Sequence, residues 1–265
     1  MKTKLRFTKM QGSGNDYLYV FGPVPKEVKD LCVRLCDRHF GVGADGMIFI
    51  GESEKADFSM RIFNADGSEA DMCGNGIRCV GKYVYDRGLT QKTGLTVETR
   101  SGIRTLALKI GDDGKVNAAA VDMGRAKLSE KTLLLSMGTG MAISVGNPHA
   151  VCFTESVKNI PLSLWGPMIE RDERFPDGVN VEFVQVLSPT RLRMRVWERG
   201  SGITLACGTG ACAAAFAAVK QGLCPAGEPI EAVLDGGSLF VTVDETDRIR
   251  MEGPAETVFE GEVEI

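Results

Sequence analysis

The sequence of 265 residues predicts an α+β fold that consists of two similar halves. The first observation is that helical and strand patterns are mixed along the chain instead of alternating as βαβ units, which favours α+β over a doubly wound sheet. The second is an internal repeat. A shift of 134 positions lays residues 61–76 over residues 195–210 without a gap, so that Cys73 falls on Cys207. In both copies the cysteine directly precedes Gly-x-Gly.

A second matched pair supports the repeat. Gly14-Asn15 and Gly146-Asn147 precede the two cysteines at nearly equal spacings, 58 residues from Asn15 to Cys73 and 60 from Asn147 to Cys207. Matched pairs in the same order are typical of a duplicated architecture. At this length the chain has room for two domains of about 130 residues, each of which is large enough to bury a core.

The elements of the first half follow from short local patterns. Alternating apolar residues on both sides of a Gly-Asn turn predict two strands within residues 5–22. Apolar residues at helical spacing and a final glycine predict a helix within residues 26–41. Further patterns predict strands within 46–52, 57–65 and 94–124, and a helix after the first cysteine loop within 76–88.

The second half repeats this order. Residues 141–153 are expected to form a strand, a turn and a strand, residues 162–175 a helix, and residues 179–199 further strands. The second cysteine loop opens an almost entirely apolar helix within residues 211–222, which should be buried on every side. Strands and turns are expected from there to the end.

Composition excludes several classes of partner. A net charge of −4 gives no reason to expect nucleic acid or an anionic membrane as a partner. No stretch has the length and apolar character of a membrane span, and the first residues contain no apolar core of a signal peptide. We therefore expect a cytoplasmic protein. A homodimer is the expected assembly, although no sequence feature specifies it.

Eight cysteines are too few for a disulfide scaffold, and their spacings do not match a zinc site. We expect no metal and no cofactor. Four of these cysteines are expected in the core, namely Cys32, Cys36, Cys152 and Cys224, and Cys79 and Cys212 should be packed within the helices behind the loops. The GVGADG run at 41–46 matches the residue pattern of a dinucleotide-binding fingerprint, which must follow a strand and open a helix. Here a helix is expected before it and a strand after it, so we interpret it as a turn.

Cys73 and Cys207 are the candidate reactive groups. A helix that starts directly after a cysteine directs unpaired N–H groups and the positive end of its dipole at the sulfur. This environment is expected to lower the pKa of both thiols. If the halves pack about a pseudo-twofold axis, one sulfur can remove a proton from a carbon while the other returns a proton from the opposite face. The sequence therefore predicts a cofactor-independent racemase or epimerase.

The segments around these residues resemble diaminopimelate epimerase. The resemblance is carried by residues 63–78, 146–151 and 197–213, and by 12–16, 176–183 and 252–265. It implies interconversion of LL- and meso-2,6-diaminopimelate in lysine and peptidoglycan precursor biosynthesis. It also implies two pseudo-symmetric domains, each a barrel-like sheet around a central helix. The expected domains are residues 1–115 with the returning strand 254–265, and residues 116–253.

The resemblance also assigns roles residue by residue. Cys73 and Cys207 match the acid–base pair, and His149 matches a supporting histidine near the cysteines. The residues that match substrate-binding positions are Asn15, Asn64, Gly74, Asn75, Asn147, Asn180, Glu198, Arg199, Gly208 and Thr209. Two positions depart from the family pattern: Gly46 stands where some members have Gln, and Ile203 where Glu is often found.

Two alternatives remain open. The first is a two-cysteine racemase of the same fold that acts on proline, hydroxyproline or histidine. The second is a thiol redox protein that uses Cys73 and Cys207 as a reversible disulfide pair. Glu198, Arg199 and the asparagines favour a substrate with a second polar terminus, which is the diaminopimelate reading.

Overall fold

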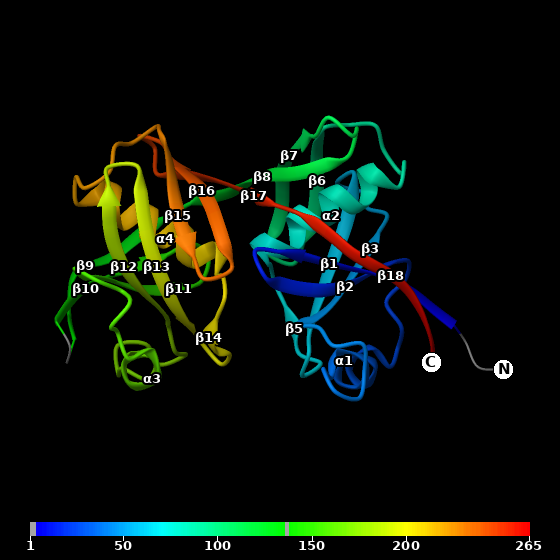
Figure 1. The fold of residues 1–265 in the computed structure, drawn as a ribbon, viewed down its shortest axis with the longest axis horizontal. Coiled ribbons are helices and arrows are strands. Elements are labelled where there is room, and N and C mark those ends of the chain that lie inside the picture. Colours follow the sequence, from blue (N-terminus) through cyan, green and yellow to red (C-terminus); the bar gives the residue numbers. More distant parts are fainter. Residues whose placement is uncertain (1–3, 136–137) are drawn as a thin grey trace. The chain divides into compact units, whose positions relative to one another are not determined.

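A computed structural model describes residues 4–135 and 138–265 (Figure 1). The contacts between residues divide the chain into two compact units. Unit 1 comprises the chain up to Val121 together with Gly253–Ile265, and unit 2 comprises Asp122–Glu252. The chain crosses between the units twice, within strand β8 (Val116–Arg125) and within strand β17 (Arg248–Pro254). The domain boundaries given above stay a prediction.

Unit 1 is built on a mixed sheet. Its hydrogen-bonded order is β18, β1, β2, β3, β4, β6, β7, β8, in which the pairs β2–β3 and β4–β6 are parallel and all others antiparallel. Helix α1 connects the first parallel pair and helix α2 precedes β6. The bounds are β1 Lys4–Gly12, β2 Asn15–Phe21, α1 Val28–Cys36, β3 Gly46–Gly51, β4 Phe58–Asn64, β5 Glu69–Ala70, α2 Gly74–Asp86, β6 Gly94–Thr99, β7 Gly102–Ile110 and β18 Glu256–Glu264.

Unit 2 repeats this arrangement strand for strand. Its order is β9, β10, β11, β12, β13, β15, β16, β17, and the parallel pairs are β11–β12 and β13–β15. Helices α3 and α4 take the places of α1 and α2. The bounds are β9 Lys127–Leu135, β10 Gly138–Ser144, β11 Pro148–Phe153, α3 Leu162–Glu170, β12 Asn180–Ser188, β13 Arg191–Glu198, β14 Gly202–Thr204, α4 Gly208–Lys220, β15 Pro229–Leu234 and β16 Gly237–Val243.

The first strand in each order is therefore the one that follows a crossing. β9 begins unit 2 after β8 leaves unit 1, and β18 completes unit 1 after β17 leaves unit 2. The α+β fold and its internal duplication, which the repeat around the two cysteines predicts, are confirmed. Strand β9 is not predicted by the sequence because its mixed polar and apolar residues give no strand alternation, and the short strands β5 and β14 are not predicted either.

A buried helix lies at the centre of each unit. Helix α4 packs against β10, β11, β12, β13, β15 and β16, and its residues from Ala211 to Ala218 are at most 1% exposed. Alanine allows this close approach because it has little side-chain volume and loses no side-chain entropy in a helix. Helix α2 packs against β1, β2, β7 and β18, and it buries Ile77, Val80 and Val84 completely. The prediction of a central helix surrounded by strands is confirmed in both units.

The cysteines assigned to the core are all buried, as the sequence predicts, and so are Cys79 and Cys212 inside the two helices. GVGADG is a turn. Over residues 4–135 and 138–265, no group of three or more His, Cys, Asp or Glu residues is arranged to hold a metal ion. The described helices include none that is long and apolar enough to cross a membrane.

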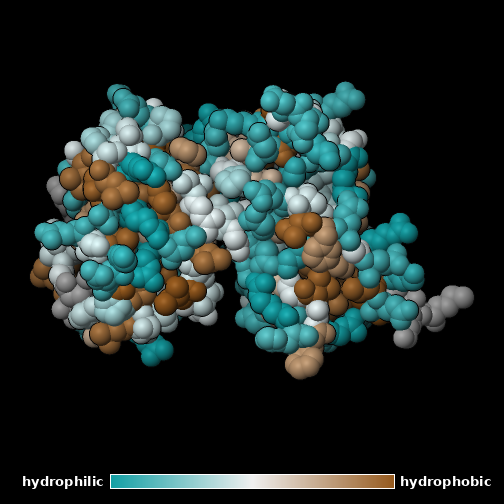
Figure 2. Space-filling view, in the orientation of Figure 1, coloured by the Kyte–Doolittle hydropathy of each residue, from teal (hydrophilic) through white to brown (hydrophobic). Residues whose placement is uncertain are grey.

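The surface of unit 1 has one apolar feature of note. Hydrophobic side chains gather where β18 crosses the visible face (Figure 2). Val258 and Phe259 of this strand are 56% and 44% exposed. Phe259 also contacts Phe7 of β1 edge to face, with 5.9 Å between the ring centroids.

Candidate active site

Cys73 and Cys207 each occupy the N-cap position of the buried helix of their unit. Both have an extended backbone, with φ/ψ of −137°/115° at Cys73 and −121°/113° at Cys207. Each Sγ accepts a hydrogen bond, 3.3 Å long, from the backbone N–H three residues later, of Gly76 and Gly210 respectively. The sulfur thus replaces the side-chain oxygen that usually caps a helix. The two candidate sulfurs occupy equivalent positions in the duplicated fold.

The first turns of these helices also present backbone amides. Gly74 and Asn75 follow Cys73, and Gly208 and Thr209 follow Cys207. In an α-helix the first N–H groups have no acceptor within the helix, and the helix dipole makes the same end attractive to anions. Each cysteine therefore lies beside a potential carboxylate-binding turn in its own unit.

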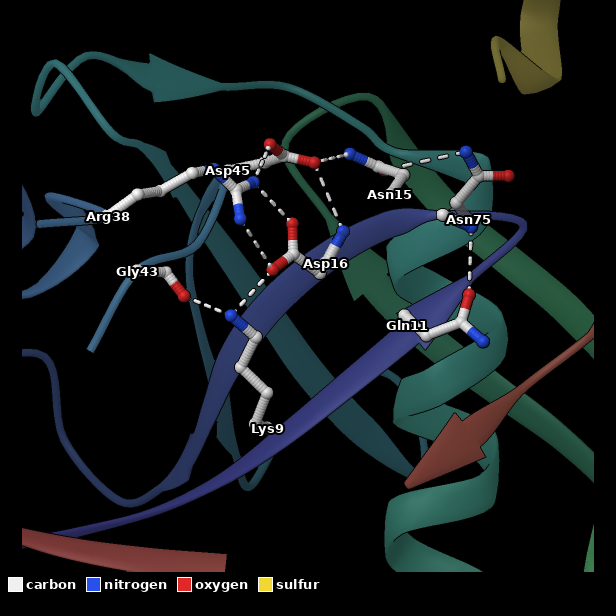
Figure 3. Close-up of polar contacts among 9 residues, drawn as sticks. Lys9, Gln11, Asn15, Asp16, Arg38, Gly43, Asp45 and Asn75 are labelled. Carbon is white, nitrogen blue, oxygen red and sulfur yellow. Dashed lines mark hydrogen bonds and ion pairs between the residues drawn. The ribbon is translucent and has the colours of Figure 1, made fainter. Parts of the chain in front are cut away.

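Asn15 is the polar side chain that joins Cys73 to the rest of unit 1. Its Oδ1 accepts a hydrogen bond from Cys73 Sγ at 3.3 Å and a longer one from Asn75 Nδ2 at 3.4 Å. Its Nδ2 donates to Asp45 Oδ2 at 2.7 Å. Figure 3 shows this carboxylate within a group of charged side chains behind Asn15. The site in unit 1 therefore extends beyond the residues that sequence reasoning identified.

Tyr17 is a second group that the sequence analysis missed. Its side chain is buried, and burial raises the pKa of its phenol well above the usual value, with the sulfur of Cys73 adding to the shift. Tyr17 lies two residues after Asn15, as His149 lies two residues after Asn147. The repeat itself was the signal that could have identified it.

A continuous chain of polar side chains leads to Cys207 in unit 2. Thr209 Oγ1 lies 3.6 Å from Cys207 Sγ and accepts a hydrogen bond from Asn147 Nδ2 at 3.3 Å. Asn147 Oδ1 is 3.0 Å from His149 Nε2, and His149 Nδ1 is 2.7 Å from Glu182 Oε1. The side chains of His149 and Glu182 are fully buried. A buried carboxylate therefore fixes the imidazole in position.

The expected lowering of the thiol pKa is wrong for Cys207. Burial is the largest influence and raises the pKa of Cys207 well above the ordinary thiol value, and the carboxylates of Glu198 and Glu182 raise it further. The hydrogen bonds from Thr209 and from the Gly210 amide act in the opposite direction and are outweighed. Desolvation disfavours an anion more than the helix N-terminus stabilises it, and sequence reasoning counted only the second effect.

The remaining predicted residues of unit 2 form a second polar group. Asn180 Nδ2 donates to the carbonyl of Pro148 at 3.1 Å, and Asn180 Oδ1 accepts from the backbone N–H of Arg199 at 3.0 Å. The guanidinium of Arg199 is exposed and donates to the carbonyl of Asp177 at 2.9 Å. Glu198 accepts a hydrogen bond from Thr204. Because Asn180 pairs with His149 in the parallel β11–β12 ladder, this group adjoins the chain that leads to Cys207.

Asn64 and Gly46 lie at the ends of strands, and Ile203 is the middle residue of β14. Asn64 donates to Ser68 Oγ at 3.0 Å. Gly46 opens β3, where an added Cβ would lie 2.2 Å from the carbonyl oxygen of Phe63 and 2.9 Å from the ring of Tyr17. Ile203 of β14 is 50% exposed. The backbone at position 46 therefore has no room for a side chain such as that of glutamine.

The structure divides the predicted site residues between the units. Unit 1 holds Asn15, Asn64, Cys73, Gly74 and Asn75, and unit 2 holds Asn147, His149, Asn180, Glu198, Arg199, Cys207, Gly208 and Thr209. Within each unit a matched asparagine is linked to the cysteine, directly in unit 1 and through Thr209 in unit 2. The residues missed are Tyr17, Asp45 and Glu182. Glu182 is fully buried in β12 between Val181 and Phe183, and a carboxylate flanked by apolar strand residues is the signal of a paired, buried charge.

Comparison with known proteins gives consistent findings. A family model described as diaminopimelate epimerase matches residues 7–129 and 141–258. A diaminopimelate epimerase of Bacteroides thetaiotaomicron is 51% identical over 273 residues, with 100% of both chains covered. One of Acetivibrio thermocellus is 45% identical over 280 residues and covers 98% of this chain and 99% of its own.

Solved structures with low sequence identity share the fold. A phenazine biosynthesis protein of the PhzF family from Bacillus anthracis has a TM-score of 0.79 at 17% identity, covering 99% of this chain and 100% of its own. A hydroxyproline epimerase from Agrobacterium vitis has a TM-score of 0.74 at 18% identity, covering 99% and 93%. At such identities the likeness concerns the fold alone.

Proposed function

Since this chain belongs to the diaminopimelate epimerase family, we propose that it interconverts LL- and meso-2,6-diaminopimelate with Cys73 and Cys207 as its acid–base pair. The observation that carries the proposal is the equivalence of the two cysteines. Each caps the buried helix of its unit, and each sulfur accepts the same 3.3 Å hydrogen bond. A reaction that runs in both directions requires two such groups, because the acid of one direction is the base of the other.

This mechanism requires the two sulfurs to reach opposite faces of the substrate α-carbon. One cysteine, as the thiolate, removes the α-proton and becomes a thiol. The other cysteine, as a thiol, donates its proton to the opposite face of the carbon and becomes a thiolate, so that configuration is inverted and no proton is gained or lost overall. The raised pKa of Cys207 favours the protonated sulfur that acts as the acid. The reaction uses no pyridoxal phosphate or other cofactor.

The helix N-termini supply the electrostatic part of catalysis. The amides of Gly74 and Asn75, and those of Gly208 and Thr209, bind the carboxylate next to the reacting carbon. Removing the α-proton places negative charge on the carbon and this carboxylate, and preorganised N–H donors stabilise charge where it develops. The positive end of the dipole of each buried helix adds to this stabilisation.

The remaining polar residues hold the rest of a long substrate with two amino and two carboxylate groups. The asparagines Asn15, Asn64, Asn147 and Asn180 offer both donors and acceptors, and Glu198 offers a carboxylate for an ammonium group. Arg199 offers a guanidinium for the distal carboxylate, and its exposed position allows that approach. His149 supports the site by holding Asn147.

Two measurements test the acid–base pair. In deuterium oxide the product should carry solvent deuterium at the inverted carbon, because the proton returned comes from a thiol that exchanges with solvent. Cys73→Ala and Cys207→Ala should each reduce turnover by at least about 10³-fold, since each removes one required proton transfer. Cys224→Ala, which changes a buried cysteine of the core, serves as the control and should retain turnover. Near-normal turnover in either alanine variant of the pair would contradict the proposal.

A substrate panel separates the diaminopimelate reading from its alternatives. We expect turnover of LL- and meso-diaminopimelate and none of proline, hydroxyproline or histidine, which lack the second amino acid group for Glu198 and Arg199. Activity should resist carbonyl reagents that trap pyridoxal phosphate. A thiol redox protein would instead keep a function after Cys73 and Cys207 are oxidised, whereas oxidation of the proposed enzyme consumes both reactive groups.

We also propose that the protein is a cytoplasmic homodimer. All eight cysteines are free thiols, which suits a reducing compartment. The exposed Val258 and Phe259 on β18 offer an apolar surface that a second copy can cover. Light scattering should give twice the chain mass, and Phe259→Glu should reduce it toward one chain. A monomeric mass for the unchanged protein would exclude the dimer.

A further inference from the structure

Both polar atoms of the Asn15 side-chain amide are held by hydrogen bonds, and this determines which of them faces the Cys73 sulfur. Figure 3 shows Asn15 between the carboxylate of Asp45 and the side chain of Asn75. Nδ2 donates to Asp45 Oδ2 at 2.7 Å, and Oδ1 accepts from Cys73 Sγ at 3.3 Å. If the amide were rotated by half a turn, its oxygen would face the carboxylate oxygen at hydrogen-bond distance, with no proton between them. The carboxylate therefore permits one orientation only.

Asp45 is itself held rigidly at the turn before β3. Its Oδ2 also accepts the backbone N–H of Asp16 at 3.1 Å, and its Oδ1 accepts Arg38 Nη2 at 2.7 Å. The same Arg38 donates to Asp16 Oδ1 at 2.7 Å, and Lys9 Nζ lies 2.6 Å from Asp16 Oδ2. The two carboxylates and two cations balance in charge. The backbone adds a hydrogen bond from Asp45 N–H to the carbonyl of Asp16 at 2.8 Å.

We propose that Asp45 is a positioning residue for the proposed epimerisation, which locks the Asn15 amide with its oxygen toward the Cys73 sulfur. A carbonyl oxygen accepts a hydrogen bond from a thiol and repels a thiolate, whereas an amide N–H stabilises a thiolate. The locked orientation therefore favours the thiol form of Cys73, the form in which Cys73 acts as the acid in the reverse direction of the reaction. Asp45 lies in the GVGADG turn, for which the proposed chemistry otherwise has no use.

Unit 2 performs the equivalent task with different residues. Asn147 is held by His149, and His149 is held by the carboxylate of Glu182, at 3.0 and 2.7 Å. The Nδ2 atom of Asn147 is thereby directed at Thr209, which contacts Cys207. In both units a carboxylate thus fixes the orientation of the asparagine that precedes the cysteine in the repeat. Asp45 holds its asparagine directly, with the amide oxygen toward the sulfur, whereas Glu182 acts through an imidazole and leaves the amide Nδ2 toward Thr209.

The phenols and the other thiol near Cys73 in unit 1 are neutral at neutral pH. The phenols of Tyr17 and Tyr19 lie beside it on β2, and the thiol of Cys79 lies one helical turn and a half further along α2. Burial raises the pKa of all three. The charged groups behind Asn15 are Lys9, Asp16, Arg38 and Asp45, and Arg78 follows on α2.

The test is the rate at which Cys73 is alkylated by iodoacetamide, followed by peptide mass spectrometry as a function of pH. This readout does not require epimerase activity, so the inference and the proposed function can fail separately. In Asp45→Asn the amide of Asn15 is free to rotate and present Nδ2 to the sulfur. We expect Cys73 to be alkylated roughly three- to tenfold faster at pH 7 than in the unchanged protein. Cys207 in the same sample serves as the internal reference and should not change.

A double-mutant cycle separates positioning from loss of the Asp45 charge. In an Asn15→Ala background the charge effect of Asp45→Asn would remain, whereas an effect that acts through the asparagine would vanish. Asp57→Asn is the matched control, since Asp57, like Asp45, pairs with a basic side chain (Lys92 in place of Arg38) and accepts a backbone N–H in unit 1. It should leave both cysteines unchanged. The proposal is overturned if Asp45→Asn does not accelerate alkylation of Cys73, or if the acceleration persists without Asn15.

Discussion

A cysteine at a helix N-terminus takes its reactivity from what faces the sulfur as much as from the helix. Cys73 and Cys207 share the same cap hydrogen bond, yet their neighbours differ. Ile48 of β3 and Glu182 of β12 occupy equivalent places in the two units. An added Cβ on Gly76 would meet Ile48, and an added Cβ on Gly210 would meet Glu182. The duplicated fold thus places an apolar group near one cap and a carboxylate near the other.

This difference predicts the result of Glu182→Gln. Glu182 raises the pKa of Cys207 because a second negative charge nearby disfavours the thiolate. Removing that charge while keeping the shape should lower the pKa, so Cys207 should ionise at lower pH. Glutamine can still accept from His149 Nδ1, so the chain to Asn147 is retained. The pH dependence of Cys207 alkylation is the measurement, Glu231→Gln in β15 is the control, and an unchanged midpoint would contradict this account.

Sequence reasoning located the two cysteines, Asn15 and Asn147 because the repeat marks them, whereas the other asparagines came from the resemblance to the family. Asp45 and Glu182 have no counterpart of the same type in the other half, so no internal comparison points to them. The direction in which the pKa of Cys207 shifts could not be predicted from the sequence either. It depends on how deeply the sulfur is buried, and a sequence pattern reports that a helix starts but not how much solvent reaches its first turn.

At the scale of the helix, the cap requires a glycine three residues after each cysteine. A Cβ on Gly210 would lie 2.6 Å from Glu182 Oε1 and one on Gly76 would lie 2.7 Å from Ile48 Cδ1. The first contact is with a buried carboxylate that His149 holds in place, and the second is with the terminal methyl of a flexible side chain. The same substitution should therefore have different costs in the two helices.

Gly210→Ala should lower the free energy of unfolding by about 1–3 kcal/mol, because the methyl group displaces Glu182 from His149. Gly76→Ala should cost less, because movement of the Ile48 methyl and the roughly 1 kcal/mol that alanine gains over glycine in a helix offset each other. Urea unfolding with an unchanged m-value measures both. Equal costs at the two positions would show that the carboxylate does not matter to the cap.

Helices with one apolar stripe and strands with one apolar face could be predicted from the sequence. An element whose formation depends on packing against distant residues of its unit could not. The helices after the cysteines and the paired strands around the Gly-Asn turns were all expected. Strand β9 was not, since its pairing with β10 contains two register shifts and its sequence has no alternation. A strand of this kind forms because a neighbouring strand offers hydrogen bonds. The local sequence pattern contains no information about which strand will be its neighbour.

For the molecule as a whole, its buried thiols and phenols predict a loss of stability in alkali. Burial raises the pKa of Cys79 to about 11 and that of Cys152 to about 12, from 9.0. A raised pKa in the folded state gives stability that is complete below pH 9 and is lost as the pH rises toward 11–12. Over that window each group should cost about 1.4 kcal/mol per pH unit.

The buried tyrosines, whose pKa values are also raised, steepen the same loss. Denaturant unfolding between pH 8 and about pH 11 measures the slope. Cys152→Ala removes one of the contributing thiols, so its slope should be shallower by about 1.4 kcal/mol per pH unit whatever its stability at neutral pH. A slope that stays the same in this variant would mean that Cys152 ionises as readily in the folded chain as in the unfolded one.

The returning strand gives the last test, because unit 1 is completed by residues that follow all of unit 2. β18 pairs with β1 from Lys4↔Glu264 to Gln11↔Glu256, and Gly261 lies so close to the ring of Phe7 that an added Cβ would be 2.5 Å from it. A chain that ends at Pro254 keeps β17 and loses only this strand. It should therefore show a separate unfolding transition at lower temperature, in which unit 1 melts while unit 2 persists.

A peptide of residues 255–265 added in excess should return that transition toward the temperature of the full chain, because a ligand that binds only the folded state stabilises it by mass action. The same peptide with Gly261→Val is the matched control, since its side chain collides with Phe7 and it should not rescue. If the shortened chain melted in a single transition at the temperature of the full chain, β18 would contribute nothing to the stability of unit 1. The order of strands would then repeat in the two units without the same energetic role, since β9 fills the equivalent place in unit 2.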